Sequence, residues 1–223
     1  MVGKEVALIN VDYTTMILLT YTPGVEVEAL GYADWLRDTD NPFFNAIPGI
    51  AHYSNWKVLE SAKSPFSHFD LLGLETSDAA EQVWFNKDLD VFRDGWVAKW
   101  GYGGDAPRSP ANGYGLLMRR DKCATPTFGR YAALAFNCVL PGGAFWIVEA
   151  ALHKHWALGP APNDAWRLPV ATSPLGLSFG LGFTEGIPPL PARRGGSPAL
   201  VGECIAAPHM PWRSGKRPGE MNP

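Results

Sequence analysis

The order of the apolar runs between residues 15 and 121 constrains the fold of this 223-residue chain more than any other feature. Four short β-prone runs bounded by turn residues predict strands at 16–22, 50–59, 66–74 and 114–120. Two longer runs with apolar residues at helical spacing predict helices over 25–44 and 79–100. The order β-α-β-β-α-β is the split β-α-β pattern. It predicts an α+β, ferredoxin-like module, to which residues 6–11 add a leading strand.

Proline divides the chain into two unlike halves. Six of the 20 prolines precede residue 122 and the other 14 follow it. Because proline interrupts helices and central strands, we expect regular structure to concentrate in residues 1–121. Residues 122–223 are expected to form a Pro/Gly-rich extension or a degenerate second module, in which the runs at 130–140 and 144–152 form two strands, or a strand and a helix. For residues 188–223 an arm, a disordered tail and an out-of-frame translation all remain open.

Composition excludes several classes of function. The net charge of −3 lacks the basic footprint of a nucleic-acid-binding protein. Three cysteines without a CxxC spacing argue against a disulfide framework or a structural zinc site, and favour a reducing, cytoplasmic location. No apolar stretch is long enough to span a membrane, and residues 1–15 lack the pattern of a signal peptide.

One segment, DWLRDTDNPFFNAIPGIAHYSNWKV at 34–58, is more specific than the rest. It resembles the EthD-like and wider dimeric α/β-barrel proteins, which commonly carry an aromatic helix, an acidic residue, a histidine and a proline, then Pro-Gly before a strand. The matching positions here are Trp35, Asp38, Asp40, Pro42 and Pro48-Gly49. The resemblance covers about residues 15–121. It implies a homodimer that closes a barrel through its sheets around a pocket for a small hydrophobic molecule.

The chain departs from that family at Asn41, where many relatives have a histidine. An amide does not titrate, so Asn41 is expected to hold a substrate carbonyl or hydroxyl by hydrogen bonding rather than to act as an acid or base. Family members include cofactor-free monooxygenases, cyclases, isomerases, lyases and haem enzymes. The resemblance therefore does not select one reaction.

Two histidines lie on neighbouring predicted strands. Alternation places His52 on one face of its strand with Trp56, and His68 on one face of the next strand with Asp70. A turn near Ala62 would pair Trp56 with His68 and His52 with Leu72, which would bring both imidazoles together. Imidazole titrates near neutral pH, so we expect His52 and His68 to be the acid–base pair and Asp70 to orient one ring. Tyr53, Asp70 and Asp40 are the next candidates, and ordinary structural histidines are the alternative.

These residues lead to one main hypothesis and two alternatives. The main hypothesis is a cofactor-independent lyase, isomerase, cyclase or oxygenase that acts on a small aromatic or hydrophobic metabolite, with apolar walls from Trp56, Trp84 and Trp96. The first alternative is a barrel that binds a small ligand without catalysis. No GxGxxG motif or phosphate-loop lysine predicts a nucleotide cofactor.

The second alternative is a divalent-metal enzyme. Glu149, His153 and His155 have a spacing that permits metal binding, and His209 is a candidate for a third protein ligand. Surface histidines are the simpler interpretation of this cluster, so the main hypothesis includes no metal.

Overall fold

The computed structural model describes residues 13–24, 26–59, 64, 66–101, 114–121, 128–152, 177–189 and 199–208. It contains eight strands: β1 (Thr15–Tyr21), β2 (Ile50–Val58), β3 (His68–Leu74), β4 (Tyr114–Arg120), β5 (Tyr131–Phe136), β6 (Ala144–Ala151), β7 (Ser178–Thr184) and β8 (Ala199–Ala206). The predicted leading strand at 6–11 lies outside the described residues. Among the helices that these ranges contain, none is long and apolar enough to cross a membrane.

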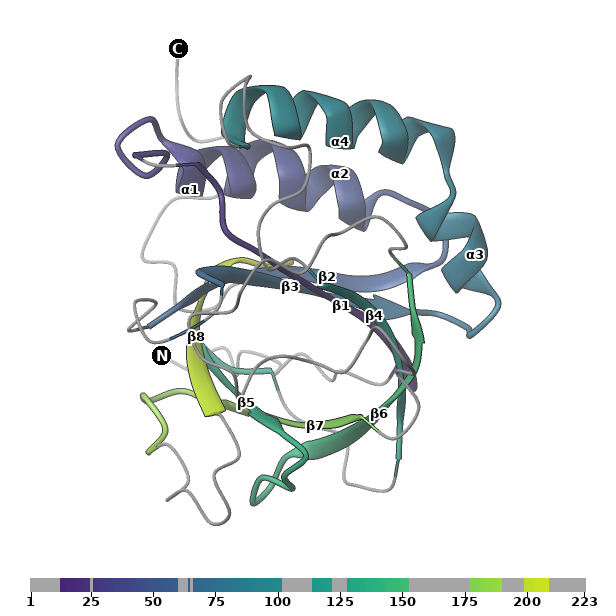
Figure 1. Cartoon of the computed structure of the whole chain (residues 1–223), viewed down its shortest axis with the longest axis vertical. Helices are drawn as coiled ribbons and strands as arrows, with labels where there is room; N and C mark the ends of the chain where they lie inside the picture. Colours follow the sequence, from purple (N-terminus) through teal and green to yellow (C-terminus); the bar gives the residue numbers. More distant parts are fainter. Residues whose placement is uncertain are drawn as a thin grey trace, which may run out of the picture.

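The eight strands form a closed antiparallel barrel (Figure 1) in the order β1-β3-β2-β8-β5-β7-β6-β4. The first half of the chain supplies β4-β1-β3-β2, and the second half supplies β8-β5-β7-β6. The two halves are joined through β2–β8 and β4–β6 pairing. Closure satisfies the backbone groups of what would otherwise be two open sheet edges.

The predicted fold class is therefore wrong. The chain does not form a ferredoxin-like α+β module with an irregular extension, or an α/β barrel, because its own second half completes a mostly β barrel. The face that a second copy was expected to cover is covered by β5–β8. The homodimer remains a prediction, but the sheet face that a second copy was expected to cover no longer supports it.

The second half can form β5 to β8 because none of these four strands contains any of its 14 prolines. The described ones, Pro141, Pro188, Pro189 and Pro208, all fall between or after strands. Two of these strands, YAALAF of β5 and SFGLGFT of β7, contain much alanine and glycine and few of the β-branched residues that reveal strands in a sequence. The proline count of the whole second half therefore gave no indication of strands β5 to β8.

An unusually short connection joins β5 to β6. Both strands are antiparallel to β7, which lies between them, so they run parallel to each other. Parallel strands are generally joined by a crossover of a dozen or more residues, whereas only residues 137–143 are available here. The connection lies so close to β7 that a Cβ added at Gly180 would stand 2.1 Å from the Cys138 carbonyl oxygen.

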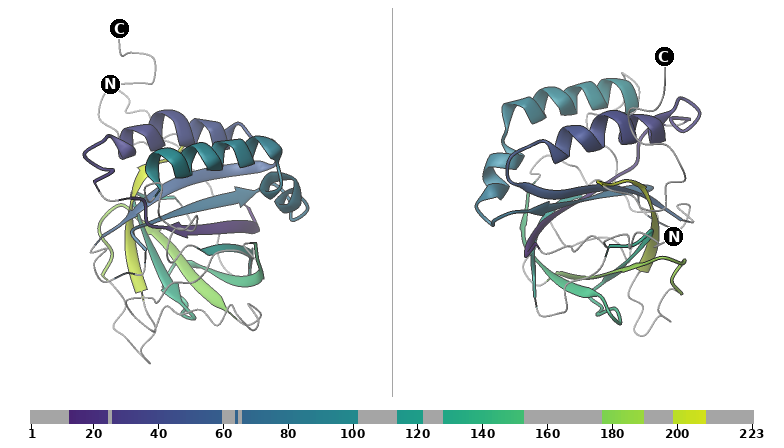
Figure 2. Two further views of the ribbon diagram at one scale, coloured as in Figure 1. Left: turned by 45° about the horizontal axis from the view of Figure 1, so that its top comes forward. Right: turned by 180° about the vertical axis from the view of Figure 1, so that it is seen from behind.

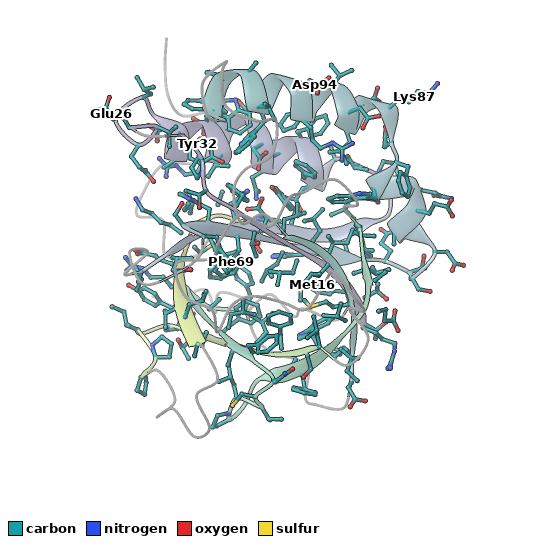
Figure 3. The ribbon with its side chains drawn as sticks, viewed as in Figure 1. Met16, Glu26, Tyr32, Phe69, Lys87 and Asp94 are labelled. Carbon is teal, nitrogen blue, oxygen red and sulfur yellow. The ribbon has the colours of Figure 1, made fainter. Side chains whose placement is uncertain are left out.

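Side chains alternate along each strand and divide the core into two layers. The barrel interior holds Met16 and Phe69 (Figure 3), with Trp56 and Trp146 among the other fully buried side chains. An eight-stranded barrel is just wide enough for side chains to fill it. The second layer lies between the outer face of β1–β3 and the helices, and includes Ile17, Tyr53, Leu72 and Val83.

All described helices lie on one side of the barrel (Figures 1 and 2), over β1, β2 and β3. The helix predicted over 79–100 is split into α3 (Ala79–Trp84) and α4 (Lys87–Trp100). Asn86 is the N-cap of α4, where its side chain accepts a 2.8 Å hydrogen bond from the Asp88 N–H.

The other helical segment contains a π turn. The chain forms α1 (Tyr32–Trp35), the π-helix η1 (Leu36–Asp40) and α2 (Asn41–Asn45) without interruption. Pro42 has no backbone N–H, and a local widening of the helix accommodates that loss. The π turn also turns two successive polar residues, Asp40 and Asn41, toward the sheet.

Candidate functional site

The strand register changes the expected arrangement of polar side chains. The structure pairs Trp56 with Phe69, Lys57 with His68 and Asn55 with Asp70, with a register irregularity between Ile50 and His52. The expected pairs Trp56–His68 and His52–Leu72 are wrong by one residue. A one-residue slip reverses the faces of a strand, so Asp70 and His68 share a face with Tyr53 rather than with His52.

Two buried carboxyl groups meet on that outer face, beneath the π turn. Asp40 comes from η1 and Asp70 from β3, and Tyr53 and Asn55 of β2 lie between them. The Tyr53 Oη is 2.8 Å from Asp40 Oδ2 and 2.9 Å from Asp70 Oδ2. The Asn55 amide donates to Asp40 Oδ2 at 2.8 Å and to Asp70 Oδ1 at 3.0 Å. Asp40 and Asp70 are 4% and 5% exposed.

The donors and acceptors of this group favour an extra proton on one carboxyl. A tyrosine hydroxyl has one proton to donate and two lone pairs. The Tyr53 Oη contacts two carboxyl groups and also accepts from the Asn55 amide at 2.9 Å. Tyr53 can donate to only one carboxylate at a time, so a protonated second carboxyl would allow both contacts to be hydrogen bonds.

Electrostatics agree with a shared proton. Burial raises the pKa of Asp40 to about 7, although hydrogen bonds from Tyr53 and Asn55 oppose the shift. Burial, and then the charge of Asp40, raise the pKa of Asp70 well above its usual range. The two groups therefore titrate as a pair rather than as separate residues. The raised pKa values are consistent with one carboxylic acid and one carboxylate in the pair near neutral pH.

The α2 helix holds β2 in place beside this pair. Near Tyr53, β2 extends beyond its pairing with β8, which covers only Asn55 to Val58. The Asn45 side chain accepts from the Tyr53 N–H at 2.9 Å and donates to the Tyr53 carbonyl at 3.2 Å, as a neighbouring strand would. Asn41 donates to the same carbonyl at 3.0 Å and to Asn55 Oδ1 at 3.1 Å. The Asn41 amide, which the sequence predicts to bind substrate, instead donates hydrogen bonds to β2 of its own chain.

His68 lies at the end of the cluster nearest the surface. Its ring stacks on Tyr21, with 5.6 Å between ring centroids, and Tyr21 donates to Asp70 Oδ1 at 3.1 Å. His68 Nε2 is 3.5 Å from Oε1 of the exposed Glu28, whose other partner is Lys57 at 2.8 Å. Burial lowers the pKa of His68, whereas His68 and then Lys57 lower the pKa of Glu28 to about 2.

His52 lies on the opposite face, inside the barrel. Its ring contacts Phe128 at 4.9 Å and Tyr13 at 6.3 Å between centroids. The sheet therefore separates the two imidazoles that were expected to act together. Of the four predicted catalytic residues, the structure brings together His68, Tyr53 and Asp70 and leaves His52 elsewhere.

The three tryptophans that were predicted to line one pocket lie in different parts of the molecule. Trp56 lies inside the barrel, where its indole N–H donates to Ser54 Oγ at 2.9 Å. Trp84 packs at the α3 end of the helix layer, with Arg93 over its ring. Trp96 of α4 lies near the carboxyl cluster, because its indole N–H donates to the Tyr32 hydroxyl at 3.0 Å and its ring contacts Tyr21.

The metal hypothesis receives no geometric support from the part of the chain that is described. Glu149 forms an ion pair with Arg119 at 2.9 Å. His153, His155 and His209 lie outside the described residues. Among the residues that the structure describes, no group of three or more His, Cys, Asp or Glu side chains could hold a metal ion.

Sequence reasoning missed Asn55 and Tyr21. Asn55 alternates with Tyr53 and Lys57 along β2, so its face could be predicted from the sequence, but an asparagine in a strand attracts little notice. Asp40 was identified only as part of the family-like segment and as a reserve acid–base candidate. Its position opposite Asp70 depends on the π turn, which the sequence pattern does not reveal.

Comparisons with known proteins add no family to this description. No family model and no curated protein matches the chain, and no solved structure matches it. The resemblance to EthD-like proteins therefore stays a prediction from residues 34–58.

Proposed function

We propose that the chain is a proton-transfer enzyme of the isomerase or lyase kind, whose acid–base group is Asp40–Tyr53–Asp70. The observation that supports this most is a single hydroxyl between two acids: Tyr53 Oη lies within 2.9 Å of both buried carboxyl groups. Buried carboxyl pairs with raised pKa values are typical of acid–base sites, although structural networks also contain them. The histidine pair of the sequence hypothesis is replaced by a carboxyl pair.

The protonation state suits a two-step proton transfer. The carboxylate of the pair removes a proton from a substrate carbon and becomes a carboxylic acid, leaving the electron pair on the substrate as an enolate. The carboxylic acid of the pair then returns a proton to another substrate atom and becomes the carboxylate. The number of protons is unchanged over the cycle, so this reaction class needs no external oxidant or reductant.

The surroundings favour a small hydrophobic or aromatic substrate. Phe44 stacks on Tyr53 at 4.3 Å between centroids, and Tyr32, Trp35 and Trp96 lie beside the carboxyl cluster. Polar groups interact more strongly where aromatic side chains exclude water, which would assist proton removal from carbon. A binding protein without catalysis would have less need of a carboxyl that titrates near pH 7.

Location and assembly belong to the same proposal. Cys138 and Cys204 are free thiols, which supports a reducing, cytoplasmic compartment. A homodimer is retained as part of the proposal. A barrel that each chain closes by itself would then have to pair through surfaces other than the sheet.

Hydrogen–deuterium exchange tests the proposed reaction without knowledge of the product. The protein is incubated in deuterium oxide with a panel of small carbonyl compounds, and proton NMR follows the loss of C–H signals next to the carbonyl group. We expect exchange of at least one compound above the uncatalysed rate. Asp70→Asn and Tyr53→Phe should each reduce the enzymatic rate by roughly 10²–10⁴-fold, the usual contribution of general acid–base catalysis.

Matched controls separate chemistry from stability. Tyr131→Phe on β5 removes a hydroxyl outside the cluster, and Asp90→Asn removes an exposed carboxylate of α4. Both controls should keep the wild-type exchange rate. If no compound exchanges faster than in buffer, or if Asp70→Asn exchanges as fast as wild type while folded by circular dichroism, the carboxyl pair is structural.

A further inference from the structure

We propose that Ser67, His68 and Glu28 form a nucleophilic site that accepts the acyl group of a carboxylic ester, an activity separate from that of the carboxyl pair. Ser67 Oγ is 2.9 Å from His68 Nδ1. His68 Nε2 is 3.5 Å from Oε1 of Glu28. A serine hydroxyl within hydrogen-bonding reach of an imidazole, whose other nitrogen faces a carboxylate, is the arrangement that activates serine nucleophiles.

The start of β3 brings the serine and the histidine together. Successive side chains of a regular strand point to opposite faces, so neighbouring residues do not meet within one. His68 is the first residue of β3, whereas Ser67 lies in the bend before it, and its hydroxyl therefore reaches the ring of the next residue. The His68 ring is held between Tyr21 and Tyr32, each at 5.6 Å between centroids.

The tautomer of His68 suits a general base at Nδ1. Nε2 faces a carboxylate and therefore carries the ring proton, which leaves the lone pair of Nδ1 to accept from the Ser67 hydroxyl. The 3.5 Å contact with Glu28 is an ion-pair distance rather than a hydrogen bond. Catalytic contacts are often long in free enzymes and shorten when the substrate binds.

The charges around His68 favour a neutral ring that can become an imidazolium. Burial lowers the pKa of His68, so the ring is uncharged near pH 7 and can take a proton. Glu28 is ionised, because the hydrogen-bonding interaction with His68 and then Lys57 lower its pKa to about 2 against the effect of burial. Its negative charge would stabilise the imidazolium, which makes Glu28 a positioning residue.

The three side chains lie at the surface, so an ester can approach them from solvent. Ser67 is half-buried, and the Glu28 and Lys57 side chains are 42% and 46% exposed. Figure 3 shows Glu26, which belongs to the same turn as Glu28, at the edge of the molecule. The nucleophile is therefore reachable although its base is buried.

The proposed reaction balances without a further reactant other than water. Ser67 Oγ forms a bond to the ester carbonyl carbon, and its proton moves to His68 Nδ1. The bond between that carbon and the alkoxy oxygen breaks, and the leaving oxygen takes the proton from Nδ1 to become an alcohol. Water, which gives a proton to the same nitrogen, then releases the acyl group as a carboxylic acid and restores the Ser67 hydroxyl.

A fluorophosphonate probe tests the nucleophile in the full chain. The serine oxygen forms a bond to phosphorus, and fluoride leaves with the serine proton. We expect mass spectrometry to locate the label on Ser67 and to find none in Ser67→Ala. Ser77 supplies the matched control, since it is exposed and its hydroxyl contacts Asp78 at 3.4 Å. Ser77→Ala should be labelled at the wild-type rate.

The labelling rate tests the other two residues. His68→Gln removes the base and should slow labelling by roughly 10²–10⁴-fold. Glu28→Gln should slow it at least about tenfold, the equivalent of one hydrogen bond to a charged group. The exposed Glu75→Gln should have no effect.

The pH dependence of labelling separates a positioning role for Glu28 from a structural one. The rate should follow the neutral fraction of His68 and reach half its plateau below the ordinary histidine pKa of 6.5. Of the charged groups that face the ring, Glu28 raises the pKa of His68 and Lys57 lowers it. The midpoint should therefore move to lower pH in Glu28→Gln, which a loss of stability alone would not produce.

The opposite results overturn the proposal. They are the absence of a label on wild-type Ser67, equal labelling of folded His68→Gln, and a Glu28→Gln variant with the wild-type rate and midpoint. If His68→Gln does not fold by circular dichroism, the wild-type pH profile decides, because a serine without a base would react ever faster with rising pH instead of reaching a plateau. A label on Ser67 without release of nitrophenolate from para-nitrophenyl acetate would reject the ester as substrate.

Discussion

A single hydroxyl, that of Tyr53, determines the protonation of its surroundings. It lies between two carboxyl groups that burial alone would keep neutral, and it can donate to only one of them. The raised pKa values of Asp40 and Asp70 also affect stability, because folding then takes up protons that the unfolded chain has released. The folded protein is expected to be most stable where both carboxyl groups can hold protons.

The first prediction is a fall in stability between about pH 4 and pH 7. A folded pKa above the unfolded value means that the stabilisation is complete at low pH and is lost as pH rises toward the folded pKa, which is about 7 for Asp40. Each extra proton held by the folded state gives a slope of about 1.4 kcal/mol per pH unit. Asp40→Asn removes one of the two coupled groups and should make this slope shallower in urea unfolding at several pH values.

The control is Asp38→Asn, an exposed carboxylate in the same π turn. It should unfold with the wild-type pH dependence. Parallel slopes for wild type and Asp40→Asn would contradict a raised pKa at Asp40.

At the scale of elements, the connection from β5 to β6 is short because it packs closely against β7. The crossover from β5 to β6 fits into residues 137–143 because β7 presents glycines to it. Gly142, with φ +69, provides a left-handed turn in the same connection. The helices over β1–β3 have no counterpart among the described residues over β5–β7, where this short connection lies on the sheet.

The second prediction compares two glycines. Gly180→Ala would place its Cβ 2.1 Å from the Cys138 carbonyl oxygen, so the crossover must move away from β7. We expect a loss of about 1–3 kcal/mol in the free energy of unfolding, as for other overpacked sites. Gly95→Ala in α4 has nothing within 4 Å of the new Cβ and should stabilise the protein by about 0.5–1 kcal/mol.

Thermal and urea unfolding of both variants measure the difference. Unchanged stability of Gly180→Ala would show that the 137–143 connection is not packed closely on β7. A loss in Gly95→Ala would instead indicate that α4 has a contact partner there.

At the scale of the whole molecule, the barrel is one cooperative structure. Every strand of the first half belongs to a sheet that ends in β2 and β4, and both of these edges pair with strands of the second half. The interior includes side chains from both halves, such as Trp56, Phe69, Trp146 and Phe179. Neither half buries its apolar face alone.

The third prediction reverses an expectation drawn from proline content. The proline content of residues 122–223 by itself predicts an arm, whose removal after Asp121 would cost less stability than its share of the chain suggests. Because the truncation removes β5–β8, it should expose two sheet edges and the barrel interior, and so produce aggregation or loss of cooperative unfolding. Circular dichroism and light scattering measure this. A soluble monomer with a cooperative melting transition would show that the first half is independent.

The sequence by itself determined the local features of this protein. The positions of β1 to β4 and the division of side chains between two faces of β2 follow from patterns within a few consecutive residues. His68, Tyr53 and Asp70 could be selected as candidates for the same reason. Only the tertiary structure decided the rest. The strand register, the π turn that aims Asp40 at Asp70, and the barrel closure by alanine- and glycine-rich strands all depend on contacts between residues far apart in the chain. A one-residue shift in pairing leaves each local pattern intact but reverses which side chains meet, and this is why the predicted histidine pair became a carboxyl pair.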